Sequence, residues 1–170
     1  MENPGHRLGQ TCEMTLVAKI VTGQVEILRG VLNGFSDARI FVPVEAIHFA
    51  RFVIVTPPGA DTESGSYLLF TCNYDGDYKA LLAALVEHLP GELDSIWGRT
   101  EGWPGRPDEP TFHEWTMAHA HRANMAYTPY PDATAAQIRK GLRLDTAVQE
   151  LFDEIRTVPA AAHLLAALES

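Results

Sequence analysis

The chain has 170 residues, of which 46% are hydrophobic and 21% are charged, and its formal net charge is -9 at pH 7. This size and composition predict one globular domain with a hydrophobic core. The acidic balance argues against nucleic acids and anionic membrane surfaces as partners, because both attract Lys and Arg. No apolar run reaches the roughly 18 to 20 residues that span a bilayer.

The two cysteines and the first residues bear on the cellular compartment. Cys12 and Cys72 lie far apart and outside any CxxC motif. We therefore expect two reduced thiols, and neither a disulfide framework nor a structural zinc site. The opening MENPGHRLGQT lacks the apolar segment of a signal peptide, so we expect a cytoplasmic protein. We interpret residues 1–13 as a flexible lead-in.

The first half of the chain predicts a strand, a helix and two further strands. β-branched and apolar residues dominate the strands, and the helix has apolar residues close to the i, i+3, i+4 and i+7 positions. Thr22 is a suitable N-cap for this helix, and Asn33-Gly34 marks its end. A connection rich in Pro and Gly predicts that the last two strands form a hairpin with a long loop. In chain order, these elements are expected over residues 14–21, 25–32, 46–55 and 67–73.

The second half of the chain predicts mostly helices. Pro90-Gly91 is expected to break the first helical stretch, and Gly141 is a candidate interruption of the longest one. The helices are expected over residues 78–89, 92–97, 112–120 and 134–155, with a short strand over 124–130 and an apolar helical tail over 160–168.

The order of these elements, β-α-β-β-α-β followed by further helix, predicts an α+β fold of the ferredoxin-like type. Two helices would bury their apolar stripes against one face of a four-stranded antiparallel sheet. We expect this domain over residues 14–131, and a C-terminal helical extension over residues 132–170 that packs on the same domain.

The strand over residues 46–55 is largely apolar on both faces. Because side chains alternate, Ile47, Phe49 and Arg51 are expected on one face and His48 on the other. An isolated ferredoxin-like unit leaves one sheet face in water, so two apolar faces predict a cover for the second. We expect either a homodimer through the sheet face or the C-terminal helices to supply this cover.

Four segments carry a family resemblance: HFARFVIV, LLFTCNYDGDYKALLAAL, LDSIWGRTEGWPG and AYTPYPDATAAQIR, in this order. Together they resemble a group of bacterial and fungal proteins with a ferredoxin-like, dimeric α+β-barrel-type module, in which HFARW-like and SNYDG-like segments recur. The resemblance covers residues 16–143. The broader superfamily includes haem enzymes, namely dye-decolourising peroxidases and chlorite dismutases, and monooxygenases without a cofactor, so it implies no single activity. The peroxidase GxxDG motif is not present as such, because Asn73 takes the place of its first Gly.

Polar residues on the second and third strands predict a ligand site. Depending on the strand register, Asn73 would join Arg51 or His48 on a common surface. An Arg, an Asn and a nearby carboxylate such as Asp75 suit a polar or anionic small molecule. The aromatic residues Trp97 and Tyr127 are further candidates, with packing beneath a long loop as the alternative. The candidate ligand-binding residues are therefore His48, Arg51, Asn73, Asp75, Trp97 and Tyr127.

The segment NYDGD also has a local explanation. Asp75-Gly76 is a turn pair in which Gly can adopt a positive φ. Asp77 is well placed to cap the N-terminus of the helix that begins at Tyr78. A calcium site is not favoured, because an EF-hand loop needs further oxygen ligands and a distal Glu.

One histidine cluster invites a metal or haem interpretation. His113 and His119 do not share one helical face, and His119 and His121 would share a side only on a strand. We expect solvated or capping histidines, and we keep one of the three as an axial haem ligand as the alternative.

Three function classes stay open from the sequence. The first is a small-molecule-binding domain that takes an apolar or anionic ligand. The second is a haem-dependent or cofactor-free oxidoreductase. The third is a non-catalytic interaction module that accompanies an enzyme.

Overall fold

A computed structural model describes residues 5–35, 39–105 and 108–157. The chain divides into two units, at the boundary between Ala135 and Ala136. Among the described residues, the first unit holds a sheet and four α-helices, and the second contains nearly all of helix α5 (Ala135–Arg156). Within the described residues, no helix is long and apolar enough to cross a membrane.

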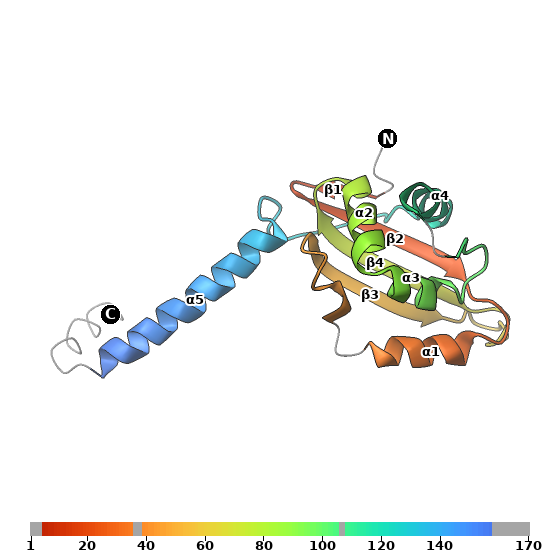
Figure 1. Ribbon diagram of the computed structural model, residues 1–170, viewed down its shortest axis with the longest axis horizontal. Coiled ribbons are helices and arrows are strands. Elements are labelled where there is room, and N and C mark those ends of the chain that lie inside the picture. The colour runs from red at the N-terminus through yellow and green to blue at the C-terminus, as the bar shows by residue number, and fades with distance from the viewer. Residues whose placement is uncertain (1–4, 36–38, 106–107, 158–170) are drawn as a thin grey trace. The chain divides into compact units, whose positions relative to one another are not determined.

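The first unit has the expected α+β fold, built on a four-stranded antiparallel sheet (Figure 1). The spatial order is β1-β2-β4-β3, so β4 pairs with both β2 and β3. Because β2 and β3 are both antiparallel to β4, they run parallel to each other with β4 between them, as in the split βαβ unit of a ferredoxin-like fold. The strands are β1 (Arg7–Leu8), β2 (Thr11–Lys19), β3 (Ile47–Val55) and β4 (Tyr67–Asp75).

The helices of the first unit cover one face of this sheet. Alternate residues of β2 and β4, such as Leu16 and Phe70, point into the core beneath them and are at most 3% exposed. The rings of Phe70 and Phe52 are in close, tilted contact, with centroids 4.6 Å apart, and Trp97 meets both rings edge-on. The helices are α1 (Val25–Gly34), α2 (Tyr78–His88), α3 (Pro90–Trp97) and α4 (Glu109–His119), with a 3-10 turn at Arg39–Phe41.

The joint between β4 and α2 confirms the local interpretation of NYDGD. The Asp77 carboxylate accepts hydrogen bonds from the backbone N–H groups of Lys79 and Ala80, at 2.9 and 3.3 Å. Gly76 has φ +85°, which an L side chain rarely adopts. This turn and cap therefore set where β4 ends and α2 begins.

Two helix starts differ from the prediction. Gln24, not Thr22, occupies the N-cap of α1, because Gly23 with φ +78° places a turn between Thr22 and the helix. The break expected at Pro90-Gly91 is present, because α2 ends at His88, but α3 begins at Pro90 and not at Glu92. Pro90 opens α3 at the first turn, where a missing N–H costs no helical hydrogen bond. Helix α5 runs through Gly141 without interruption.

The predicted strand over residues 124–130 is wrong. That segment is irregular, and the edge of β2 is taken by β1 and by a single bridge between Leu16 and Ala120. Pro129 and Pro131 lack the N–H donors that a ladder needs, which explains why the segment does not pair. Since β1 and the first residues of β2 lie within residues 1–13, that lead-in is not wholly irregular either. The tail over 160–168 lies outside the described residues.

Candidate functional site

The second face of the sheet, here called the open face, carries the alternate side chains that do not point towards the helices. Phe49 and Val53 of β3 are 54% and 39% exposed on this face, and Val55 and Tyr67 are similarly exposed. Among the described residues of the first unit, no helix covers these side chains. The open face consists of Thr15, Val17, Lys19, Phe49, Arg51, Val53, Val55, Tyr67, Leu69, Thr71 and Asn73.

A β-bulge in β3 changes the side on which His48 lies. The register pairs Ile47 with Tyr74 and Phe49 with Asn73, so His48 is an extra residue between two matched pairs. Ile47 is buried with Tyr74, and it does not share the open face with Phe49 as expected. The prediction that His48 and Arg51 lie on opposite faces is therefore wrong, because the bulge interrupts the alternation on which it was based.

His48 reaches the end of β4, where it forms the closest side-chain pair of the sheet. Its Nε2 lies 2.6 Å from Oδ1 of Asp75, and both side chains are about 15% exposed. The other Asp75 oxygen accepts a hydrogen bond of 2.6 Å from the backbone N–H of Ala135. Asp75 is thus held from two sides, and it fixes the orientation of the imidazole as a carboxylate does for a catalytic His.

Arg51 and Asn73 lie on the same face as this pair. Arg51 Nε donates to Thr71 Oγ1 at 3.0 Å, directly across the strands, and Asn73 is opposite Phe49 in the neighbouring row. The strand register therefore brings four of the six predicted ligand-binding residues to one half of one face. The opposite half, with Val53 and Val55, is mostly apolar, and its one charged residue, Lys19, pairs with Glu101 at 2.8 Å. The open face consequently has a polar end, at His48, and an apolar end.

Glu13 is a polar residue of this region that the sequence interpretation missed. It is 5% exposed and lies opposite Asn73 on β2. Its carboxylate accepts hydrogen bonds from the backbone N–H groups of His6 and Ala123, at 2.9 and 3.4 Å. A lone Glu within a strand gives no signal in the sequence, because its partners come from the two ends of the first unit.

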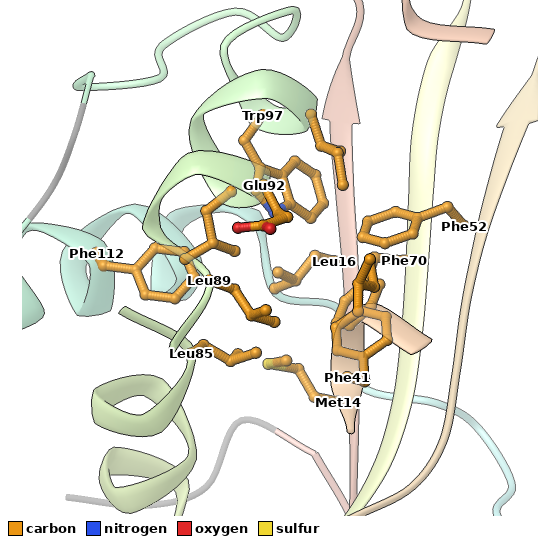
Figure 2. Close-up of a pocket in the computed structure, with 13 residues that line it drawn as sticks. Met14, Leu16, Phe41, Phe52, Phe70, Leu85, Leu89, Glu92, Trp97 and Phe112 are labelled. Atoms are coloured by element: carbon orange, nitrogen blue, oxygen red, sulfur yellow. The ribbon is translucent and has the colours of Figure 1, made fainter. Parts of the chain in front are cut away.

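Trp97 is separate from the other candidates, because it lines a cavity between the helices and the covered face. Figure 2 shows Phe52 and Phe70 on the sheet side of this cavity, and Trp97 and Phe112 on the helix side. The cavity measures about 20 Å³, which is room for about one water molecule. Glu92 is the only charged residue among the described residues that line it.

A second, more polar hollow lies over α3 and the loop that follows it. It has a volume of about 600 Å³ and is open to solvent. Its walls include Trp103, whose indole N–H donates to Asp94 at 2.9 Å, and Arg99, which donates to Gln24 at 3.2 Å. The polar groups of this hollow mainly tie the loop to α3.

The remaining candidates do not converge on either place. Tyr127 is 75% exposed on the irregular segment after α4. His119 stacks on Trp115 and its Nδ1 bonds the Trp115 carbonyl oxygen at 2.8 Å, while His113 packs edge-on against Tyr78. Across the described ranges, no three His, Cys, Asp or Glu residues are grouped so that they could hold a metal ion.

Burial raises the pKa of three groups on the covered side of the sheet. Desolvation is the largest cause for the Tyr74 and Tyr78 phenols and for the Cys72 thiol. The Tyr78 hydroxyl donates to Thr116 Oγ1 at 2.7 Å, whereas the buried Tyr74 hydroxyl has no hydrogen-bond partner in the described part of the chain. These groups stay protonated and are poor candidates for acid-base chemistry near neutral pH.

Comparison of the chain with protein-family models, with curated proteins and with solved structures gives no match. The resemblance to α+β-barrel-type proteins therefore stays a prediction.

Proposed function

We propose that this chain is a small-molecule-binding domain, and that the ligand contacts the polar end of the open face. The observation that carries the proposal is the 2.6 Å contact between His48 and Asp75, on the face that also holds Arg51 and Asn73. The oriented imidazole supplies a hydrogen-bonding and proton-accepting group. The guanidinium of Arg51 and the amide of Asn73 supply donors for a polar or anionic group.

The apolar end of the same face supports a ligand with an apolar part, and it also supports a homodimer. Small-molecule sites combine apolar walls with a few polar groups, and they are concave. A second copy placed on the open face would bury Phe49 and Val53 and would close the space above His48. Neither Cys12 nor Cys72 forms a disulfide, and both are buried, which fits a reducing, cytoplasmic location.

A titration with small aromatic carboxylates, beginning with benzoate and salicylate, tests the proposal. We expect chemical-shift changes in 1H-15N spectra at His48, Arg51 and Asn73, and a rise in the melting temperature. Arg51→Gln should abolish both effects, because it removes the cation that faces the ligand. Arg29→Gln is the matched control, since Arg29 is exposed on α1 and pairs with Glu26. Equal behaviour of the two variants would contradict a role for the open face.

The cavity beside Trp97 favours a second candidate, the binding of a small apolar molecule between sheet and helices. Its lining is apolar apart from Glu92, and such cavities admit apolar guests. Xenon under pressure is a suitable probe, and spectral changes should centre on Trp97. Leu85→Ala enlarges the cavity and should strengthen xenon binding, whereas Leu82→Ala removes a buried side chain that does not line it. Equal effects of both variants would exclude this cavity as the site.

The oxidoreductase alternative is tested by a visible absorption spectrum after addition of hemin. A Soret band that shifts on binding, and that disappears in His113→Ala, His119→Ala or His121→Ala, would favour a haem enzyme. We expect no such band, because His113 and His119 are both engaged by aromatic neighbours.

A further inference from the structure

Helix α5 carries exposed apolar side chains along its length. Leu144 and Leu151 are 63% and 54% exposed, and Val148 is 37% exposed. A helix of 22 residues is about 33 Å long, so these side chains form an extended stripe. An exposed stripe of this kind marks an interaction surface.

The spacing of the stripe is that of a coiled coil. Gly141, Leu144, Val148, Leu151 and Ile155 follow one another at alternating intervals of three and four residues, which are the a and d positions of a heptad. Val148 and Ile155 occupy a positions, and Leu144 and Leu151 occupy d positions. β-branched residues at a and Leu at d favour two parallel strands.

The flanking charges fit the same pairing. In this register, Lys140 is a g residue and Asp145 is the e residue that follows it. In a parallel, in-register pair, the g residue of one helix lies beside the e residue of the following heptad in the other helix. Lys140 of each copy would therefore face Asp145 of the other copy, which gives two equivalent ion pairs. The next g and e residues are Ala147 and Phe152, which extend the apolar seam. No like charges oppose each other within Lys140–Ile155.

We propose that α5 pairs with α5 of a second copy as a parallel, two-stranded coiled coil. The proposal does not depend on small-molecule binding at the open face. Only about two heptads are available, and isolated helices of this length are marginal. The open face alone is also a small interface. Its three nine-residue strands offer a planar area of roughly 400 Å², whereas a standard interface buries about 800 Å² per partner. Two weak contacts in one dimer reinforce each other by raising the effective concentration.

Cysteine cross-linking of the full chain tests the pairing directly. Cys12 and Cys72 are both buried, so an added thiol dominates the oxidation products of the folded protein. Leu151→Cys places two thiols opposite each other at a d position, and we expect most of the protein to become a covalent dimer on mild oxidation. Asp153→Cys, at the outward f position, is the matched control and should give little covalent dimer. Equal yields, or a higher yield at residue 153, would overturn the proposal.

Charge reversal provides an independent readout. Lys140→Glu places a carboxylate beside Asp145 of the second copy, and we expect the dimer dissociation constant, measured by sedimentation equilibrium, to rise about three- to tenfold. Adding Asp145→Lys to this variant should return the dissociation constant to the wild-type value. A double variant as weak as the single one would contradict parallel pairing. A wild-type chain that stays monomeric would overturn the proposal and indicate that α5 covers a surface of its own chain.

Discussion

On the covered face of the sheet, Leu16 and Phe70 are at most 3% exposed, whereas Phe49 on the open face is more than half exposed. The residues themselves do not differ in kind, because β3 places an aromatic ring on each side, Phe52 towards the helices and Phe49 away from them. The difference therefore lies in what each face meets. Helices of the same unit complete the covered face, whereas no helix among the described residues of that unit covers the open face.

The largest expected effect comes from emptying the covered face. Trp97→Ala removes an indole that meets Phe52, Phe70 and Trp115, and we expect a loss of about 3 to 5 kcal/mol in the free energy of unfolding. Urea denaturation measures it. Phe49→Ala is the matched change on the open face and should cost less than about 1 kcal/mol at concentrations where the chain is monomeric. Similar losses would mean that the open face is buried in the monomer.

Alkaline pH should also act through the covered face. Burial raises the pKa of Tyr74 and Tyr78 in the folded state, so folding favours their protonated forms. The contribution of these two phenols to stability is therefore complete below the pKa of an unfolded tyrosine, about 10, and is lost as the pH rises above it, because only the unfolded chain then releases their protons. Urea midpoints between pH 8 and pH 11 measure this, and Tyr78→Phe should flatten the decline.

The phenols of Tyr74 and Tyr78 allow a comparison between a buried hydroxyl that has a hydrogen-bond partner and one that has none in the described chain. Tyr78→Phe breaks the hydrogen bond to Thr116, and we expect a loss of about 1 kcal/mol. Tyr74→Phe removes a buried hydroxyl without a partner in the described chain, so we expect no loss or a gain of up to about 1 kcal/mol. Thermal unfolding at pH 7 compares them. A larger loss for Tyr74→Phe than for Tyr78→Phe would show that the Tyr74 hydroxyl has a partner in solution.

The smallest effect is expected at the apolar end of the open face. Val53→Thr keeps a β-branched residue on a half-exposed position, so the stability of the monomer should change by less than about 0.5 kcal/mol. The same substitution should weaken a dimer formed through this face, which concentration-dependent sedimentation would reveal. A change in monomer stability without a change in association would remove the open face as a dimer interface.

Local features of this fold could be predicted from the sequence, and features set by distant pairing could not. The Asp77 cap and the Gly76 turn depend on neighbouring residues alone, and both predictions are confirmed. The side on which His48 lies depends on a bulge in β3 against β4. Asp75 bonds His48, which precedes it by 27 residues, and Ala135, which follows it by 60 residues. Alternation along one strand contains no information about such a shift.

The same limit explains the candidate site. The sequence predicts that Asn73 shares a surface with either Arg51 or His48, and the bulged ladder between β3 and β4 places it with both. Glu13 and Glu92 were missed, since an isolated Glu in an apolar segment is chemically ordinary until its surroundings are known. Of the two aromatic candidates, Trp97 packs against Trp115, whereas Tyr127 is 75% exposed.

The central position of β4 has a consequence for how the protein is made. β4 is the last of the three long strands to be synthesised, yet it is the partner of both others. Until Asp75 has left the ribosome, β2 and β3 lack their shared partner and expose unpaired edges together with the apolar side chains of the covered face, which favours association between nascent chains. Translation stalled before that point should therefore yield insoluble fragments, whereas release after His119, once α4 has been made, should allow the sheet and its helical cover to form together.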